Sequence, residues 1–305
     1  MALNVVCIVG VGRSGTTLLD RILGTVPGTV SLNELRPLWR NGFLHNRLCA
    51  CGAVFNECAF WIDVRRRLER EFSWSAQEMV ELHDRVDRTR WVPGLLIERR
   101  RGRFAQDVRD YRRLLKSLYQ AIAECSGVDT VIESSKVPSR ALLLSGIPEF
   151  NVELVHIVRD IRGVAYAWTK QRRDPTLEQE IPRYRAWRSV AFWYHRNLLI
   201  EALRSRLPYV RVSYEQLAAA PRATTARLIE QLSALSGRAA AFEGEQSVRL
   251  NPVHSMSGNT QRFQIGATEI CVDDEWRRRL PSRTRRFIEV TAMPLLAHYG
   301  YPVRT

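Results

Sequence analysis

Apolar residues gather in short runs bounded by turn-forming residues, and each run precedes a stretch with helical spacing. These runs predict strands at Asn4–Val9, Thr130–Glu133, Val152–Val158 and Tyr209–Ser213. Because strands and helices alternate, the pattern indicates βα units. We therefore expect an α/β fold of three layers, in which helices cover a central parallel sheet.

Between about Trp61 and Ser126 the pattern changes to charged amphipathic helices, such as AQDVRDYRRLLKSLYQAIAEC. We interpret this region as a helical insertion that caps the carboxyl edge of the sheet, where ligands bind in open α/β folds. Residues 1–305 are expected to form a single domain that includes this insertion. Further helices are predicted at Pro182–Leu203, Pro221–Ser236 and Asp274–Tyr299, and residues 244–247 and 254–266 are predicted to be loops.

The composition is that of a soluble globular chain. Its 305 residues are 45% hydrophobic and 26% charged, which is enough to bury a sizeable core. No apolar run approaches the roughly 20 residues of a membrane span. The first strand begins near Leu3, so there is no room for a signal peptide before it. We expect a cytoplasmic protein without a membrane span.

The net charge is +14, with a pI near 10.1, and it comes almost entirely from arginine. The chain has three lysines, so 43 of its 46 basic residues are arginine. We interpret the arginine runs at 65–67, 99–101 and 277–279 as solvated helix faces. The positive field should nevertheless speed the capture of a polyanionic ligand.

Three of the six cysteines, Cys49, Cys51 and Cys58, lie close together in the sequence, with His45 nearby. These residues would supply four zinc ligands, but the C-x-C-x6-C spacing is not that of a standard zinc finger. A disulfide is the second alternative, and a reducing cytoplasm disfavours it. We expect free thiols in a compact loop and no metal. The other three cysteines, Cys7, Cys125 and Cys271, are interpreted as ordinary core or surface residues.

Residues 6–19, VCIVGVGRSGTTLL, combine a predicted strand, a glycine-rich turn and a helix that begins near Thr16. Backbone N–H groups and the positive helix end in such an arrangement bind anions. Gly10 and Gly15 have the separation found in the G-x-x-x-x-G-K-[ST] loop of ATP and GTP enzymes, but Thr16 replaces the lysine. Since that lysine contacts the β and γ phosphates, we expect a ligand without a γ phosphate.

The segment VGRSGTTLLDRIL resembles the 5′-phosphosulfate loop of sulfotransferases that use 3′-phosphoadenosine 5′-phosphosulfate (PAPS). That donor has no γ phosphate, in agreement with the missing lysine. The resemblance implies that PAPS is the co-substrate and that no metal is needed. It also implies a phosphosulfate-binding set consisting of Gly12, Arg13, Ser14, Gly15, Thr16 and Thr17.

A second segment, VELVHIVRDIRGVAYAW, resembles the 3′-phosphate element of the same family and implies that Arg159 binds this phosphate. The arginine fork suits phosphate oxygens. The family generally has a serine eight residues later, where this chain has Ala167, and Thr169 is a candidate replacement. Loss of one hydrogen bond to a charged group would cost about 1.5–3 kcal/mol. We therefore expect donor affinity to be modest.

Two later segments complete the resemblance. RVSYEQLAAAP is similar to the strand and helix in which the family often places a tyrosine near the adenine, which implies this role for Tyr214. SGNTQRF is similar to the loop that closes over the donor, which implies that Arg262 reaches its 3′ end.

Sulfuryl transfer requires an in-line displacement that is catalysed by positioning and by cations. Glu34 in SLNELRPLW is the candidate base, because related sulfotransferases have a glutamate about as far beyond the loop arginine as the 21 residues seen here. Lys136 in VIESSKVPSR is the candidate cation for the transferred group, beside Arg13. Glu133 is the reserve base.

Two other functions compete with this interpretation. A P-loop kinase or NTPase would need the missing lysine and a strand that ends in a magnesium-binding aspartate. An arginine-rich nucleic-acid-binding protein would show a recognition motif, and the sequence has none. The acceptor is expected to be a hydroxyl-bearing small molecule, glycan or lipid rather than a nucleic acid. Its identity and the oligomeric state do not follow from the sequence.

Overall fold

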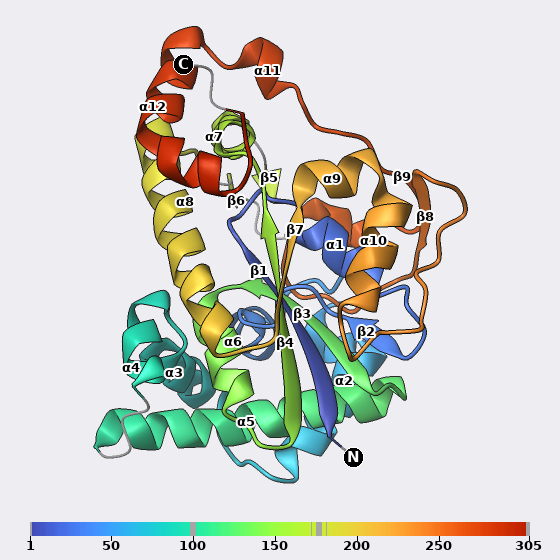
Figure 1. Cartoon of the computed structure of the whole chain (residues 1–305). Coiled ribbons are helices and arrows are strands. Elements are labelled where there is room, and N and C mark those ends of the chain that lie inside the picture. The colour runs from blue at the N-terminus through green and yellow to red at the C-terminus, as the bar shows by residue number, and fades with distance from the viewer. Residues whose placement is uncertain (1, 98–101, 172, 175–178, 181, 303–305) are drawn as a thin grey trace.

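The structure is a computed structural model that describes residues 2–97, 102–171, 173–174, 179–180 and 182–302. Its main sheet has five strands: β1 (Leu3–Gly10), β2 (Thr29–Ser31), β3 (Thr130–Lys136), β4 (Phe150–Val158) and β7 (Tyr209–Ser213). They are all parallel, in the order β2-β3-β1-β4-β7 (Figure 1). The four predicted strands are confirmed. Strand β2 was missed because its three residues include a single apolar side chain.

Side chains of β1 alternate between two helical layers, which makes the three layers that the sequence predicts. Val5 and Cys7 pack into one apolar cluster, and Val6 and Ile8 into another. Helices of the first cluster are α2 (Ala59–Glu69), α3 (Ala76–Val86), α4 (Val92–Leu96), α5 (Arg103–Ser126) and α6 (Pro138–Ser145). Helices of the second are α1 (Thr16–Leu23), α9 (Tyr214–Ala219) and α10 (Pro221–Glu230).

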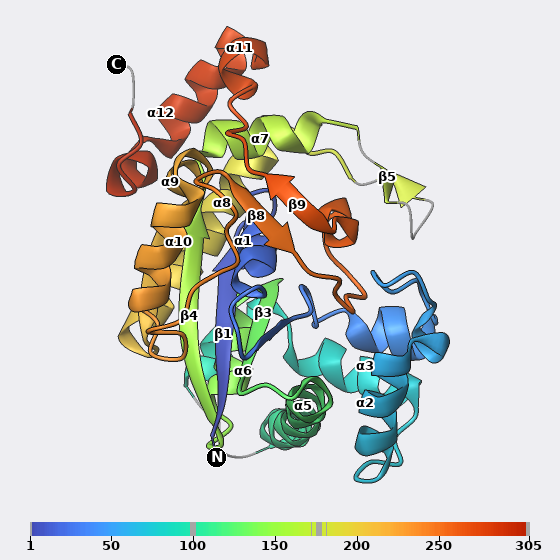
Figure 2. The same cartoon turned by 90° about the vertical axis from the view of Figure 1, so that its right-hand side faces the viewer.

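The predicted insertion is helical but does not cap the carboxyl edge of the sheet. Its helices α2 to α5 pack on one face of the sheet, and Figures 1 and 2 show α5 beside the end at which β1 begins. The physical reason is the apolar stripe of α5, which stays buried from Ala105 to Ala123. A stripe of this length needs a broad apolar surface, which a sheet face provides and a strand edge does not.

A third apolar cluster joins helices near the carboxyl ends of β1 and β4. Its helices are α7 (Ile161–Thr169), α8 (Ala186–Glu201), α11 (Trp276–Arg279) and α12 (Ser282–His298). The helical segment predicted at Asp274–Tyr299 is confirmed, and it divides into two helices at Leu280. That residue is extended, with ψ 122°, as expected for a residue before a proline.

Two short antiparallel sheets complete the fold: β5 (Arg173–Asp174) with β6 (Gln179–Glu180), and β8 (Ser247–Leu250) with β9 (Gly266–Glu269). The loops predicted at 244–247 and 254–266 are confirmed except at Ser247 and Gly266, which begin β8 and β9. The sequence analysis did not predict the hairpin itself, which Figure 2 shows beside α1. Arg21 of α1 fixes this hairpin by donating to the carbonyl oxygens of Asn251, Arg262 and Gln264 at 2.6–2.7 Å. Short helical turns lie at Trp39–Leu44, Phe55–Glu57, Thr89–Trp91, Ala202–Ser205 and Thr260–Phe263.

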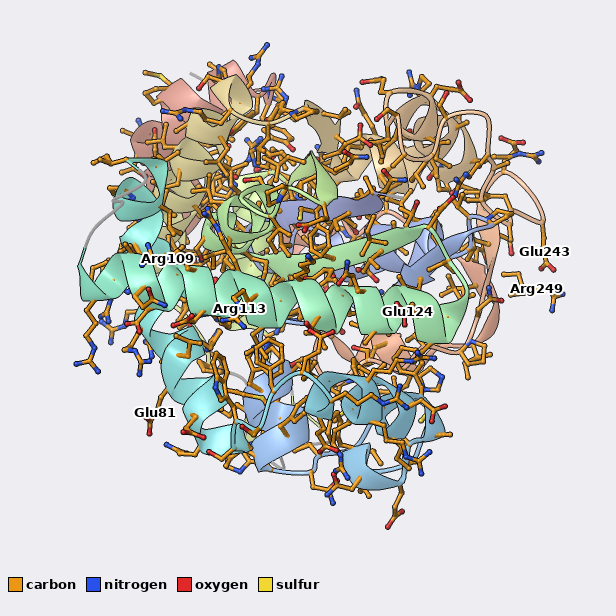
Figure 3. The ribbon with its side chains drawn as sticks, turned by 90° about the horizontal axis from the view of Figure 1, so that it is seen from below. Glu81, Arg109, Arg113, Glu124, Glu243 and Arg249 are labelled. Atoms are coloured by element: carbon orange, nitrogen blue, oxygen red, sulfur yellow. The ribbon has the colours of Figure 1, made fainter. Side chains whose placement is uncertain are left out.

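Charged side chains on the outer face of α5 are exposed, and so are Arg66 and Arg67 in the run at 65–67, as predicted for solvated faces. Figure 3 views α5 from below with Arg109, Arg113 and Glu124 labelled, and all three side chains are exposed. Residues 277–279 are exposed as well, whereas the run at 99–101 lies outside the described residues. Among the residues that the structure describes, no helix combines the length and the apolar character needed to cross a bilayer.

Candidate active site

A cavity of about 660 Å³ opens where the main strands end, next to the glycine-rich loop after β1. None of the described residues between 61 and 126 lines it, in agreement with the position of the insertion on the sheet face. Its wall includes the ends of β1 and β3, the residues after β4 and β7, and the loop between β8 and β9. Of the predicted site residues, nine line it: Gly12, Arg13, Gly15, Thr16, Thr17, Glu34, Lys136, Arg159 and Tyr214.

The glycines of the loop are needed because aromatic rings and backbone lie very close to them. A Cβ atom on Gly15 would lie 2.6 Å from Cδ2 of Tyr214, and the backbone there is left-handed, with φ 87°. A Cβ atom on Gly12 would lie 2.9 Å from Cζ2 of Trp168. Gly15 is also the N-cap of α1, and no described side chain caps that helix end. The first N–H groups of α1 are therefore suited to an anion in the cavity.

Arg13 lies in the same loop, in a left-handed conformation with φ 74°. Its guanidinium carbon is 4.9 Å from the ring centroid of Trp168, which makes a cation–π contact. Its carbonyl oxygen accepts a hydrogen bond of 3.0 Å from Nη1 of Arg159. The two arginines that the sequence assigns to opposite ends of the donor are thus directly linked.

Arg159 follows β4 and is 5% exposed. Its Nη2 donates to the carbonyl oxygen of Asp273 at 2.9 Å and pairs with the Asp273 carboxylate at 3.1 Å, and its guanidinium carbon is 4.2 Å from the ring centroid of Tyr214. Burial alone would raise the pKa of Asp273, but the charge and hydrogen bond of Arg159, together with Lys170, lower it below its ordinary value. The carboxylate is therefore ionised, and an anion that binds Arg159 must compete with it.

Glu34 and Lys136 form an ion pair at the cavity, in which Nζ of Lys136 donates to Oε1 of Glu34. Their side chains are 22% and 19% exposed, so water and small molecules reach both. Lys136 ends β3 with a left-handed φ of 67°, just after β3 shifts its register against β1. Pairing with β1 resumes at Lys136 after this shift, so β3 extends beyond the predicted end at Glu133.

The reserve base, Glu133, does not line the cavity. It is 1% exposed and accepts hydrogen bonds from the Tyr119 hydroxyl and from the Ser135 N–H, the latter at 2.6 Å. Burial raises its pKa above the ordinary value. Glu133 therefore belongs to the structural core beneath the site.

Two predicted donor ligands, Ser14 and Arg262, do not reach the cavity. Ser14 is buried within its turn, where its N–H donates to the carbonyl oxygen of Val11 at 3.2 Å. Arg262 is 2% exposed, and its Nη1 donates to the carbonyl oxygen of Gly258 at 2.8 Å. The loop residues 258–261 line the cavity, but the Arg262 side chain lies beneath them. The donor contact predicted for Arg262 stays a prediction, and in the structure this side chain bonds within its own loop.

Ala167, the departure from the family pattern, does line the cavity. The suggested replacement, Thr169, is exposed and absent from the wall, and its hydroxyl donates to the carbonyl oxygen of Tyr166 at 2.7 Å. Thr169 therefore does not take the position of the missing serine.

Two arginines that the sequence analysis missed also line the cavity, Arg36 and Arg196. The Arg36 N–H donates to Oγ of Ser135 at 2.9 Å, and Nη1 of Arg196 donates to the carbonyl oxygen of Lys136 at 3.0 Å. Burial, followed by the charge of Arg36, lowers the pKa of Arg196 to about 10. The sequence offers a signal for Arg36, because it follows the candidate base Glu34 by two residues. Arg196 lies 60 residues from Lys136 on α8, so no local signal marks it.

Comparisons with known proteins give a family and a fold. A family model described as "Sulfotransferase family" matches residues 6–234, which is well over half of the chain. The solved structure "Sulfotransferase Domain from the Curacin Biosynthetic Pathway" is 17% identical, with 99% of each chain covered and a TM-score of 0.50. The "Sulfotransferase Domain from the Synechococcus PCC 7002 Olefin Synthase" is 18% identical over 95% of this chain and 94% of that chain, with a TM-score of 0.47. The comparison with curated proteins gave no match. At this identity, the likeness to the first structure bears on the fold alone.

Proposed function

The chain belongs to the sulfotransferase family, and we propose that it moves a sulfuryl group from PAPS to an acceptor hydroxyl. One observation carries the proposal. The cavity brings the uncapped helix end, Arg13 and Arg159 together with the Glu34–Lys136 pair in a single wall. A donor with a phosphosulfate at one end and a phosphate at the other needs two separate sets of cations and donors.

The residues present agree with such a donor. The loop N–H groups and Arg13 offer hydrogen-bond donors and charge for a phosphosulfate, and no lysine follows Gly15 to bind a γ phosphate. Arg159 offers a buried, fixed guanidinium for the 3′ phosphate. Tyr214 packs against Arg159, which supports the predicted position of this ring near the nucleoside.

In the proposed reaction, the acceptor oxygen forms a bond to sulfur while the bond from sulfur to the phosphate oxygen breaks. Glu34 accepts the hydroxyl proton, since its carboxylate faces the cavity and is reachable from solvent. Lys136 stabilises the charge on the transferred group. Arg13 and the N–H groups of the loop stabilise the phosphate that leaves. The residues thereby supply positioning, charge and one proton acceptor.

The acceptor is proposed to bind at an aromatic part of the cavity wall. Trp168 and Phe192 contribute aromatic surface to the wall, beside Arg36 and Arg196. Such a surface suits an alcohol that carries an apolar or glycosidic group. We therefore propose a small-molecule, glycan or lipid acceptor, as the sequence predicts. A screen of acceptor alcohols with radiolabelled donor would identify the class.

Calorimetry at low salt with adenosine 3′,5′-bisphosphate tests the donor assignment, with ATP and magnesium as the competing ligand. We expect binding of the bisphosphate, and weaker binding in Arg13→Ala and Arg159→Ala. Arg283→Ala is the matched control, because it removes the same charge from an exposed position of α12. No association with the bisphosphate would refute the donor assignment. Tighter binding of ATP with magnesium would refute it in favour of a P-loop nucleotide enzyme.

A further inference from the structure

Four potential metal ligands converge away from the cavity: Cys49, Cys51, Cys58 and His254. Their donor atoms all lie within 4.8 Å of one another. The Sγ atom of Cys58 is 3.6 Å from that of Cys51, 3.9 Å from that of Cys49 and 3.2 Å from Nδ1 of His254. His45, the histidine nearest in sequence, is exposed and not part of the cluster. The fourth member instead comes from 196 residues beyond Cys58.

These distances are those of ligands that share a metal ion. Zinc binds thiolates at about 2.3 Å, so two sulfurs on a tetrahedral zinc lie about 3.8 Å apart. A disulfide has an S–S distance of about 2.05 Å, and all three cysteines are free thiols in the structure. Three sulfurs and one imidazole also suit zinc better than the hard cations magnesium and calcium, which prefer oxygen.

The backbone around the cysteines holds them toward one point. The Cys49 N–H donates to the carbonyl oxygen of Ala53 at 2.8 Å, which closes a tight turn around Cys51. Gly52 occupies the left-handed position of this turn, with φ 95°. Cys58 is the N-cap of α2, where the positive helix end favours a thiolate.

The imidazole is held just as firmly. The ring of Phe60 stacks on that of His254, with centroids 4.7 Å apart and an angle of 11° between the planes. Nε1 of Trp61 donates to the His254 carbonyl oxygen at 2.9 Å, and the Ala50 N–H donates to that of Ser255 at 2.9 Å. These contacts tie the histidine to the cysteine turn and to the start of α2.

We propose that Cys49, Cys51, Cys58 and His254 bind a zinc ion that fixes the loop leading from His254 into the wall of the cavity. Four protein ligands fill a tetrahedral site, which is typical of structural zinc rather than catalytic zinc. The exposed Cys51 side chain gives the ion a route from solvent, and binding releases the thiol protons to solvent. The loop continues from His254 to Gly258 and Gln261, which line the cavity.

Metal analysis of the full chain, expressed with zinc and purified without chelator, tests the site itself. We expect about one zinc ion per chain that survives dialysis, and its loss in Cys51→Ser and Cys58→Ser. Cys51→Ser changes an exposed side chain, so a folding defect is not expected there, and circular dichroism checks this. Cys125→Ser, a cysteine outside the cluster, is the matched control and should keep the metal.

A wild-type chain that stays free of zinc after incubation with Zn²⁺ would overturn the proposal. So would full zinc retention in both variants, or a disulfide among the three cysteines in peptide maps of unreduced protein. Reconstitution with Co²⁺ gives a second readout, since tetrahedral thiolate ligation produces strong visible absorption that Cys51→Ser should weaken.

Hydrogen–deuterium exchange tests the effect on the loop. Removal of zinc by a chelator should raise exchange at residues 254–261 while leaving α12, which belongs to another apolar cluster, unchanged. Equal exchange in the zinc-bound and zinc-free chains would refute the structural role. None of these experiments depends on catalysis, so their outcomes are independent of the proposed function.

Discussion

Lys136 with Glu34 and Arg159 with Asp273 are two ion pairs among the described residues of the cavity, and they differ in how far each cation is buried. In the first pair, both side chains are about equally exposed, at 19% and 22%. In the second, the Arg159 side chain is 6% exposed and the Asp273 side chain 33% exposed. Arg159 is also held by the Arg13 carbonyl oxygen and the Tyr214 ring, whereas the second cation near the Asp273 carboxylate is Lys170, at 4.0 Å.

In the proposed function, the two ion pairs have separate uses. At the Arg159 end, the Asp273 carboxylate pairs with a buried guanidinium that the incoming phosphate is proposed to bind in its place. At the Lys136 end, the carboxylate is itself the proposed reactive group, and the lysine is its neighbour. Exposed ion pairs contribute about 0–1 kcal/mol to stability. Because Arg159 is buried, opening its pair requires that the incoming phosphate replace the carboxylate as its partner. The predictions below test this contrast.

The largest effect is expected for Glu34→Gln, which keeps the shape of the side chain but removes its ability to accept a proton. General base catalysis contributes about 10²–10⁴-fold in rate. We expect kcat to fall by about 100-fold or more, with little change in affinity for the bisphosphate. Steady-state assays with radiolabelled donor and calorimetry measure the two quantities. Wild-type turnover with the true acceptor would show that another group is the base.

Arg159→Ala should act mainly on donor affinity. It removes a charge-assisted contact worth about 1.5–3 kcal/mol, which corresponds to a loss of roughly 10- to 100-fold in affinity for adenosine 3′,5′-bisphosphate. Arg159→Lys keeps the charge but loses the planar fork. Its affinity for the bisphosphate should therefore lie between those of the wild type and of Arg159→Ala. Calorimetry measures the affinities, and a melting curve controls for the lost support of Arg13. If the affinity stays at the wild-type value, the 3′ phosphate binds elsewhere.

Asp273→Asn should have a smaller effect in the opposite direction. It removes the competing charge but keeps the carbonyl oxygen that accepts from Arg159 at 2.9 Å. Since a partly exposed pair is worth about 0–1 kcal/mol, we expect bisphosphate affinity to rise by up to about fivefold. The gain should shrink as salt is added. Weaker binding in this variant would indicate that Asp273 positions Arg159 rather than competing for it.

The smallest effect is expected for Ala167→Ser, which restores the serine of the family pattern in the cavity wall. A net hydrogen bond contributes about 0.5–1.5 kcal/mol, and the packed surroundings of Ala167, 3% exposed, will offset part of it. We therefore expect roughly a twofold gain in bisphosphate affinity. Ala167→Val, which adds bulk without a hydroxyl, is the control. An equal gain in both variants would exclude a hydrogen bond as the cause.

The sequence predicted those parts of the fold that depend on neighbouring residues. The strand, glycine turn and helix at the amino end were recognisable because Gly12, Gly15 and the apolar run before them lie within a few residues of one another. The break between α11 and α12 follows an equally local rule, because Pro281 disfavours a helical conformation at Leu280, but this signal was overlooked. Strand β2 is too short to give an apolar run.

Contacts between distant segments were beyond sequence reasoning. Asp273 reaches Arg159 over 114 residues, and Arg196 reaches Lys136 over 60. For the cysteine cluster, the sequence suggested His45 as the fourth ligand because it is nearest in the chain. In the structure, packing places His254 beside the cysteines instead. The role predicted for Arg262 stays a prediction; in the structure its side chain donates to the carbonyl oxygen of Gly258 in the same loop.

By itself, the sequence determined the parallel α/β architecture, the loop after the first strand and nine of the residues that line the cavity. These depend on backbone preferences and apolar periodicity, which act over a few residues at a time. Only the tertiary structure decided which carboxylate pairs with which cation, where the insertion packs and which histidine joins the three cysteines. Those outcomes depend on how separately folded elements pack, because packing sets the distances between side chains that the chain itself keeps far apart.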